Sequence, residues 1–173
     1  LYTESDAEKS MPKAEAAKRR LRSINSDVDI ISIVGEVTYP SLLNMLPADI
    51  VIDALDNFDT RMLINDFCAK HEIPWIHGAV VSSYGVSYTV LPGKTPCLHC
   101  LLESIPLGTE TCDTVGVISP VVQMVSAHQT TEALKILTEQ TNNLTNTLIS
   151  FDLWKNESSS IQVNELKNEN CPS

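Results

Sequence analysis

Apolar and polar positions alternate along the first half of the chain in blocks that predict helices and strands in turn. Residues 12–24 carry apolar side chains three and four positions apart, as on one face of a helix. The β-branched run 28–34 and the short apolar run 48–55 predict strands. The other elements expected here are a short helix over 41–46, a helix over 59–71 and a strand over 74–81. This alternation predicts an α/β fold with a parallel sheet.

The second half of the chain predicts a different kind of pairing. A strand over 84–91 is expected to run antiparallel to the strand before it, through a turn at Ser82 and Ser83. The last expected elements are a long helix over 118–137 and closing strands over 147–153 and 160–165. We therefore predict a Rossmann-like, mostly parallel sheet with an antiparallel C-terminal extension.

Composition narrows the classes of protein that fit this pattern. The 173 residues suffice for a hydrophobic core, and a formal net charge of −10 argues against nucleic-acid binding, which takes a basic surface. No apolar run approaches the ~20 residues of a membrane span, and we expect no signal peptide. The five cysteines, an odd count with one Cys-x-x-Cys pair, favour thiol chemistry in a reducing cytoplasm. The start at Leu1, without methionine, suggests a piece of a longer protein.

The first candidate site follows the apolar run 48–55. Ligands of open α/β sheets bind outside the carboxyl ends of the strands, so Asp56 stands where a carboxylate can hold Mg²⁺ against phosphates. The alternative is that Asp56 or Asn57 caps the next helix. Asp53 lies inside the strand run and is expected to be buried and hydrogen-bonded rather than a ligand.

The second candidate site is the pair of thiols Cys97 and Cys100, separated by two residues. Such a pair can hold one tetrahedral zinc ion, with Cys171 as a third ligand and the fourth beyond the C-terminus. The alternative is a thioredoxin-like redox pair, which opens a helix after a strand. The Pro-Gly loop before the pair and the distant Cys171 favour zinc, and His99 is expected to be exposed rather than ligating.

Two further residues are candidates for chemistry. Cys112 lies in a polar loop before the long helix, where an accessible thiolate can act as a nucleophile, and the alternative is an ordinary thiol. Lys13 stands near a helix start and can meet a phosphate, although most lysines are simply solvated. The histidines at positions 71, 77 and 128 are isolated in the sequence and are interpreted as structural.

Four stretches, taken in order, resemble the ThiF/MoeB/HesA family, the bacterial relatives of ubiquitin-activating enzymes. They run over nearly the whole chain, and the ordered set is specific although no single stretch is. The stretches are Met11-Pro12-Lys13-Ala14-Glu15-Ala16-Ala17, then Asp53-Ala54-Leu55-Asp56-Asn57 with Arg61 after it, then Gly93-Lys94-Thr95-Pro96-Cys97-Leu98-His99-Cys100, and Thr111-Cys112-Asp113-Thr114-Val115-Gly116-Val117-Ile118-Ser119-Pro120.

The resemblance implies adenylation of the C-terminal Gly-Gly of a ubiquitin-like sulfur carrier, ThiS-like or MoaD-like, with ATP and Mg²⁺, for thiamine or molybdopterin biosynthesis. Family members are usually homodimers, and Arg61 and Asn65 match recurrent helix positions near the site. The other roles that the resemblance assigns are ATP phosphate contact to Lys13, Mg²⁺ binding to Asp56 beside Asn57, zinc binding to Cys97, Cys100 and Cys171, and in some members a covalent bond with the carrier to Cys112.

The sequence also departs from the family. No Gly-x-Gly-x-x-Gly occurs among the six glycines, and Leu55 stands where threonine is common. We therefore expect residues 1–173 to be a single ThiF-like domain that lacks the N-terminal nucleotide loop and is cut just after Cys171. Such a fragment is expected to bind ATP poorly and to be inactive alone. The alternatives are a non-catalytic zinc-stapled binding module or degenerate relative, and an NAD-dependent oxidoreductase, which the missing dinucleotide fingerprint disfavours.

Overall fold

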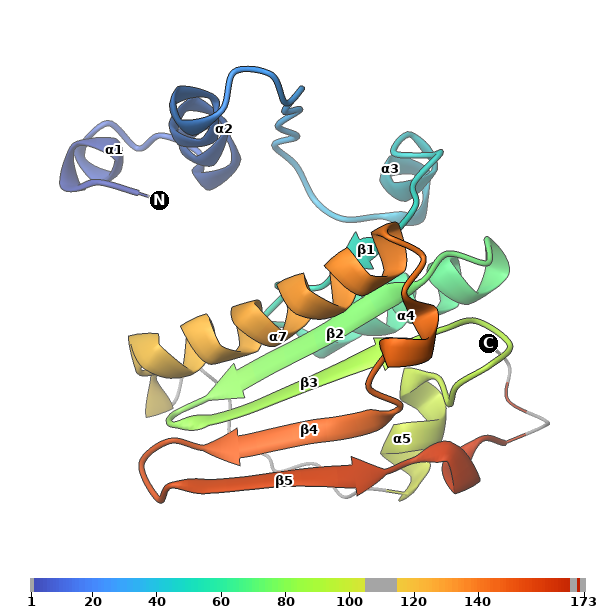
Figure 1. The fold of residues 1–173 in the computed structure, drawn as a ribbon. Coiled ribbons are helices and arrows are strands. Elements are labelled where there is room, and N and C mark those ends of the chain that lie inside the picture. Colours follow the sequence, from blue (N-terminus) through green and yellow to red (C-terminus); the bar gives the residue numbers. More distant parts are fainter. Residues whose placement is uncertain (1, 105–114, 169–170, 172–173) are drawn as a thin grey trace. The chain divides into compact units, whose positions relative to one another are not determined.

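The computed structural model describes residues 2–104, 115–168 and 171, and the chain divides into two compact units (Figure 1). The first unit comprises Leu1–Val37 and the second Thr38–Ser173. Among the described residues, every helix is too short or too polar to traverse a lipid bilayer.

Two helices form in the first unit, α1 (Glu4–Glu8) and α2 (Lys13–Ile24). A capping box starts α1: the Thr3 side chain accepts from the backbone N–H of Asp6, and the Asp6 side chain accepts from that of Thr3. The buried Asp6 carboxylate also pairs with Arg19 and so joins the two helices. Hydrogen bonds from Thr3, and then the pairing with Arg19, lower the pKa of Asp6. The helix predicted in this region is confirmed.

The strand predicted over 28–34 is wrong, because the structure has no strand there. Most of its apolar side chains are exposed, and Ile31 is 76% exposed. A strand needs a neighbour for its backbone hydrogen bonds, and the described part of the first unit supplies none. The side chain of Ser32 instead donates to Glu15 on α2 at 2.7 Å. The β-branched pattern therefore indicated strand propensity without the partner that a strand requires.

A five-stranded sheet forms the centre of the second unit. Its strands, in spatial order, are β1 (Val51–Ile52), β2 (Trp75–Val81), β3 (Tyr84–Val90), β4 (Thr147–Asp152) and β5 (Glu157–Gln162). β1 and β2 pair in parallel, and the later pairings are all antiparallel. The mixed sheet with its antiparallel extension is confirmed, and among the described strands the antiparallel part is the larger. The predicted turn at Ser82 and Ser83 joins β2 to β3.

The helices of the second unit pack against the sheet and against one another. They are α3 (Tyr39–Leu43), α4 (Phe58–Lys70), α5 (Leu98–Ser104) and α7 (Ser119–Leu137), with the 3-10 helices η1 (Thr141–Asn143) and η2 (Asn164–Leu166). α7 crosses one face of the sheet over β2 and β3 (Figure 1). Trp75 and Ile76 point to opposite faces of β2 and both are fully buried, so both faces of the sheet are covered there.

Several elements differ in extent from their predictions. Only β1 forms within the apolar run 48–55, because Asp53 turns the chain: its side chain accepts from the N–H of Leu55 at 2.8 Å. β5 ends before the strand predicted over 160–165 does, because the chain passes into η2. α3 begins earlier than predicted, since Thr38 caps it.

Close packing of α7 on the sheet depends on Gly85 of β3. A Cβ atom at this position would lie 2.7 Å from a ring carbon of Phe151 and 2.8 Å from a methyl group of Val125. Non-bonded carbon atoms do not come this close, so the neighbouring atoms would have to move. Phe151 and Val125, with Val121, form the core beneath α7. The missing side chain at position 85 therefore lets the helix sit close to the strands.

We expect Gly85→Ala to lower the free energy of unfolding by about 1–3 kcal/mol, because the added methyl group overpacks this core. Urea unfolding followed by circular dichroism measures the change. Gly35→Ala is the control: nothing lies within 4 Å of a Cβ built there, and the substitution should shift the value by less than ~0.5 kcal/mol. A Gly85 variant as stable as the parent protein would contradict the close packing.

Candidate active site and thiol cluster

Asp56 lies in the segment between β1 and α4, at the carboxyl end of a strand that pairs in parallel, and it is exposed. The next residue, Asn57, caps α4: its side-chain oxygen accepts from the N–H of Thr60 at 2.9 Å. The capping alternative is therefore confirmed for Asn57, whereas the carboxylate of Asp56 faces solvent. An exposed carboxylate in this place fits the oxygen ligand that Mg²⁺ prefers.

Asp53, at the end of β1, has the opposite environment and is only 1% exposed. Its Oδ1 accepts from the N–H of Leu55 at 2.8 Å. Its Oδ2 lies 3.1 Å from Nε of Arg61 and 2.9 Å from Nδ1 of His77. Because an ionised carboxylate can only accept, both nitrogens donate to it. The prediction that Asp53 is buried and hydrogen-bonded is confirmed.

Arg61 of α4 links three parts of the second unit. Besides Nε, which reaches Asp53, its Nη2 donates to the carbonyl oxygen of Leu55 and, at 3.1 Å, to that of Gly78. The arginine side chain is mostly buried. One guanidinium group thus ties α4 to the segment after β1 and to β2. This use of several donors in fixed directions is a property of arginine that lysine lacks.

α7 holds the same strand end through Gln129. Its buried Nε2 donates to the carbonyl oxygen of Asp53 at 2.7 Å and to that of Ile76 at 3.1 Å. A Cβ atom on Gly78 would lie 2.4 Å from this nitrogen, so the strand needs glycine there. The carbonyl groups at the ends of the parallel pair are therefore satisfied by a side chain from the covering helix.

The sequence prediction missed the roles of His77 and Gln129 beside Asp53. His77 lies 24 positions after Asp53 in the sequence, and Gln129 lies 76 positions after it, so no local spacing connects them. One signal was present in the sequence. Gly78 interrupts an apolar strand run, and a glycine inside a strand often marks a close approach by another group.

The structure brings the thiols of Cys97, Cys100 and Cys171 together, with the three sulfur atoms within 4.8 Å of one another. The Cys97 sulfur lies 3.7 Å from that of Cys100 and 3.1 Å from that of Cys171. Two ligands of a tetrahedral zinc ion with Zn–S bonds near 2.3 Å have their sulfur atoms about 3.8 Å apart. The separation of Cys97 and Cys100 matches this value, whereas that of Cys97 and Cys171 is shorter. Three soft thiol donors are of the kind that zinc binds, and the described residues add no fourth ligand to the cluster.

Cys97, just before α5, and Cys100, within it, are anchored by buried polar side chains nearby. Asn65 of α4 accepts from the N–H of Leu98 at 2.8 Å, and the Tyr88 hydroxyl donates to the carbonyl oxygen of Pro96 at 3.0 Å. Burial raises the pKa of Tyr88 to about 12, and the neighbouring Cys100 and Cys97 act in the same direction. Tyr88 therefore remains a hydroxyl donor at neutral pH.

The segment before Cys171 is tied to the loop that precedes Cys97 and to α5. Lys167 donates from Nζ to the carbonyl oxygen of Gly93 at 2.5 Å, and Asn168 donates to Glu103 of α5 at 3.4 Å. These contacts hold the segment before Cys171 beside a loop that lies more than seventy positions earlier in the sequence.

The remaining thiol and histidine near these elements lie outside the cluster. Cys68 of α4 is fully buried, and burial raises its pKa to about 12, so it stays protonated. His99 pairs with Asp66 instead, with 2.9 Å between Nε2 and Oδ1. The sequence predicts that His99 is exposed rather than ligating; it is half-buried, and its ring pairs with Asp66 rather than joining the described thiol cluster.

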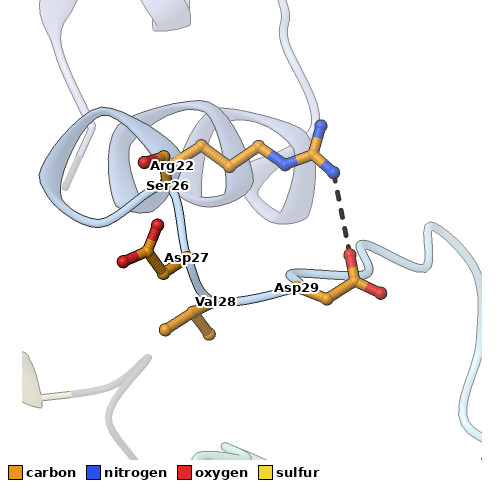
Figure 2. Close-up of a pocket in the computed structure, with 5 residues that line it drawn as sticks. All are labelled: Arg22, Ser26, Asp27, Val28 and Asp29. Carbon is orange, nitrogen blue, oxygen red and sulfur yellow. Dashed lines mark ion pairs between the residues drawn. The ribbon is translucent and has the colours of Figure 1, made fainter.

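Two further candidates from the sequence are Lys13 and Cys112. Lys13 is the first residue of α2 in the first unit, and it is exposed. Cys112 lies outside the described residues, and its role stays a prediction. A shallow pocket in the first unit is lined by Arg22, Ser26, Asp27, Val28 and Asp29 and does not include Lys13 (Figure 2). Exposed side chains line it, with 3.8 Å between Nη2 of Arg22 and Oδ1 of Asp29, so it has no buried group to hold a ligand.

The chain is similar to known proteins over its whole length. The ThiF family matches residues 1–173. The sulfur carrier protein ThiS adenylyltransferase of Bacillus subtilis is 53% identical over 174 residues, which cover 100% of this chain and 51% of that protein. The SAMP-activating enzyme E1 of Haloferax volcanii is 35% identical over 150 residues, which cover 85% of this chain and 55% of that protein. The chain thus spans about half the length of these curated relatives.

The fold also matches solved structures. A crystal structure of MccB from E. coli with ATP superposes with a TM-score of 0.79 at 22% identity, covering 99% of this chain and 52% of that chain. At this identity the likeness establishes the fold alone. The sequence match over the whole chain establishes more: the protein belongs to the ThiF family.

Proposed function

We propose that this chain forms part of an ATP-dependent adenylyltransferase that activates the C-terminal Gly-Gly of a ubiquitin-like sulfur-carrier protein, ThiS-like or MoaD-like. The observation that carries the proposal is the 53% identity, over the whole chain, with a protein named for adenylating ThiS. The exposed Asp56 at the carboxyl end of β1, beside a rigidly held strand end, supports it from the geometry. The product would serve thiamine or molybdopterin biosynthesis.

In this reaction an oxygen of the carrier's terminal carboxylate attacks the α-phosphorus of ATP. A new bond forms between that oxygen and phosphorus, the bond to the β-phosphate bridge breaks, and pyrophosphate leaves. Asp56, with Asn57 next to it, is the residue we propose for holding Mg²⁺, which when bound would offset the charge of the phosphates. Lys13 is proposed to contact the phosphates. Cys112 is proposed as the thiol that bonds the carrier after activation.

The thiol cluster is proposed to hold zinc in a structural role. Cys97, Cys100 and Cys171 would fix the end of the chain to the loop before α5. Thiol ligands of this kind persist in a reducing compartment, so we propose a cytoplasmic location. We also propose that the protein acts as a homodimer, as members of the resembled family usually do.

Asp56→Asn is expected to lower carrier-dependent exchange between ATP and pyrophosphate by roughly 100-fold or more, because the amide lacks the negative charge that holds the cation. The assay uses the intact protein with a ThiS-like carrier. Asp59→Asn is the matched control, since Asp59 is an equally exposed carboxylate in the first turn of α4, and it should leave exchange nearly unchanged. Exchange by the Asp56 variant at the parent rate would refute its role.

Cys100→Ser is expected to lower the zinc affinity of the intact protein by at least about 100-fold, because a hydroxyl is a poor replacement for a thiolate ligand. Zinc content after dialysis is measured by mass spectrometry. Cys68→Ala provides the control: it also removes a buried thiol, but one outside the cluster, and zinc should be retained. Full zinc content in the Cys100 variant would contradict the site.

Cys112→Ser is expected to leave adenylation intact and to abolish the later transfer of sulfur to the carrier, because a hydroxyl does not replace the thiolate nucleophile at neutral pH. The two steps are separated by assaying pyrophosphate exchange and the mass of the carrier. Unchanged sulfur transfer would remove Cys112 from the mechanism. Absence of exchange with every sulfur carrier, in the parent protein, would favour a non-catalytic binding module instead.

A further inference from the structure

Leu55, the residue that precedes Asp56, is fixed at both of its backbone polar groups. The N–H of Leu55 donates to Oδ1 of Asp53 at 2.8 Å, and its carbonyl oxygen accepts from Nη2 of Arg61. On the other side of Asp56, Asn57 is fixed as the cap of α4. The exposed side chain of Asp56 therefore projects from a backbone whose neighbours on both sides are held.

Arg61 is the element of this arrangement that reaches furthest. It holds Leu55 directly, it holds Asp53 through Nε, and it is itself located by the carbonyl oxygen of Gly78 on β2. The side chain is 14% exposed, so water does not compete freely for these groups. The guanidinium group thus fixes the segment 53–57 relative to the sheet.

We propose that Arg61 is a positioning residue for Asp56: through Leu55 and Asp53 it sets the place from which the Asp56 carboxylate binds a magnesium–nucleotide complex. This inference rests on the proposed function. The inference goes beyond the proposed function because it assigns part of the affinity for the cation to a residue that does not contact the cation. Lysine in place of Arg61 keeps the positive charge beside Asp53, but its donors all stand on one nitrogen atom, whereas Arg61 reaches its three acceptors from two separate nitrogens in a fixed planar group.

The competing explanation is that Arg61 only stabilises the fold by pairing with a buried carboxylate. The two explanations differ in what depends on Asp56. If Arg61 only stabilises the fold, its replacement would affect unfolding in the same way whether residue 56 is aspartate or asparagine. It would not change the Mg²⁺ concentration that ATP binding requires. A positioning role requires that the effect on Mg²⁺ disappear once Asp56 is replaced.

The test uses the intact protein and the variants Arg61→Lys, Asp56→Asn and both together. ATP binding is titrated at a series of Mg²⁺ concentrations, without any carrier, and hydrogen exchange of peptides covering 53–57 is measured without nucleotide. We expect Arg61→Lys to raise the Mg²⁺ concentration for half-maximal ATP binding by about 10- to 100-fold and to speed exchange in the segment. In the Asp56→Asn background it should add no further shift.

Arg22→Lys is the matched control, because Arg22 is an exposed arginine of the first unit, and it should change neither measurement. If Arg61→Lys does not fold, Asp53→Asn combined with Arg61→Gln replaces it, since this pair leaves no unpaired buried charge. The same increase in Mg²⁺ requirement and exchange is expected.

The outcomes distinguish the positioning role of Arg61 from the proposed function. If Asp56→Asn raises the Mg²⁺ requirement but the Arg61 variants do not, the positioning role is overturned and the proposed function stands. If the Arg61 variants act equally in both backgrounds, their role is structural and the inference is likewise overturned. If Asp56→Asn itself changes nothing, the Mg²⁺ site fails, and the positioning role fails with it.

Discussion

The burial of the Asp53 carboxylate is the constraint on which the second unit depends. A carboxylate removed from water is tolerated only when its oxygens are paired, and leaving a buried charge without its partner costs about 3–5 kcal/mol. Here the partners come from different elements: Leu55 from the turn itself, Arg61 from α4 and His77 from β2. Satisfying one side chain therefore requires β1, β2 and α4 to be in place together.

α4 extends this constraint to the thiol cluster. Arg61 and Asn65 stand four residues apart on the helix, and residues at this spacing lie on the same side of it. Arg61 holds the end of β1, while Asn65 accepts from the N–H of Leu98 at the start of α5, next to Cys97. The helix is thus a link between the segment that carries Asp56 and the start of α5, where Cys97 and Cys100 lie.

Local signals in the sequence predicted most of the second unit. Helix α4 and the β2–β3 hairpin depend on periodicity and turn residues close to each other in the chain, and both were found. The strand at 28–34 was wrong because strand formation depends on a partner that no local pattern reveals. The cysteines were grouped correctly because thiols have few common roles, whereas the contacts of Asp53 with His77 and Gln129 join distant elements and leave no spacing to read.

Asp53 and Asp56 show how the same side chain acquires two functions within one turn of chain. Both oxygens of Asp53 are occupied by donors, so its charge is neutralised internally and no oxygen remains for a cation. Asp56 is exposed, so its carboxylate is accessible to a cation from solvent. The turn that Asp53 makes is what places Asp56 beyond the strand end. Under the proposed function, the buried carboxylate would serve catalysis without contacting a substrate, because it orders the backbone that carries the exposed one.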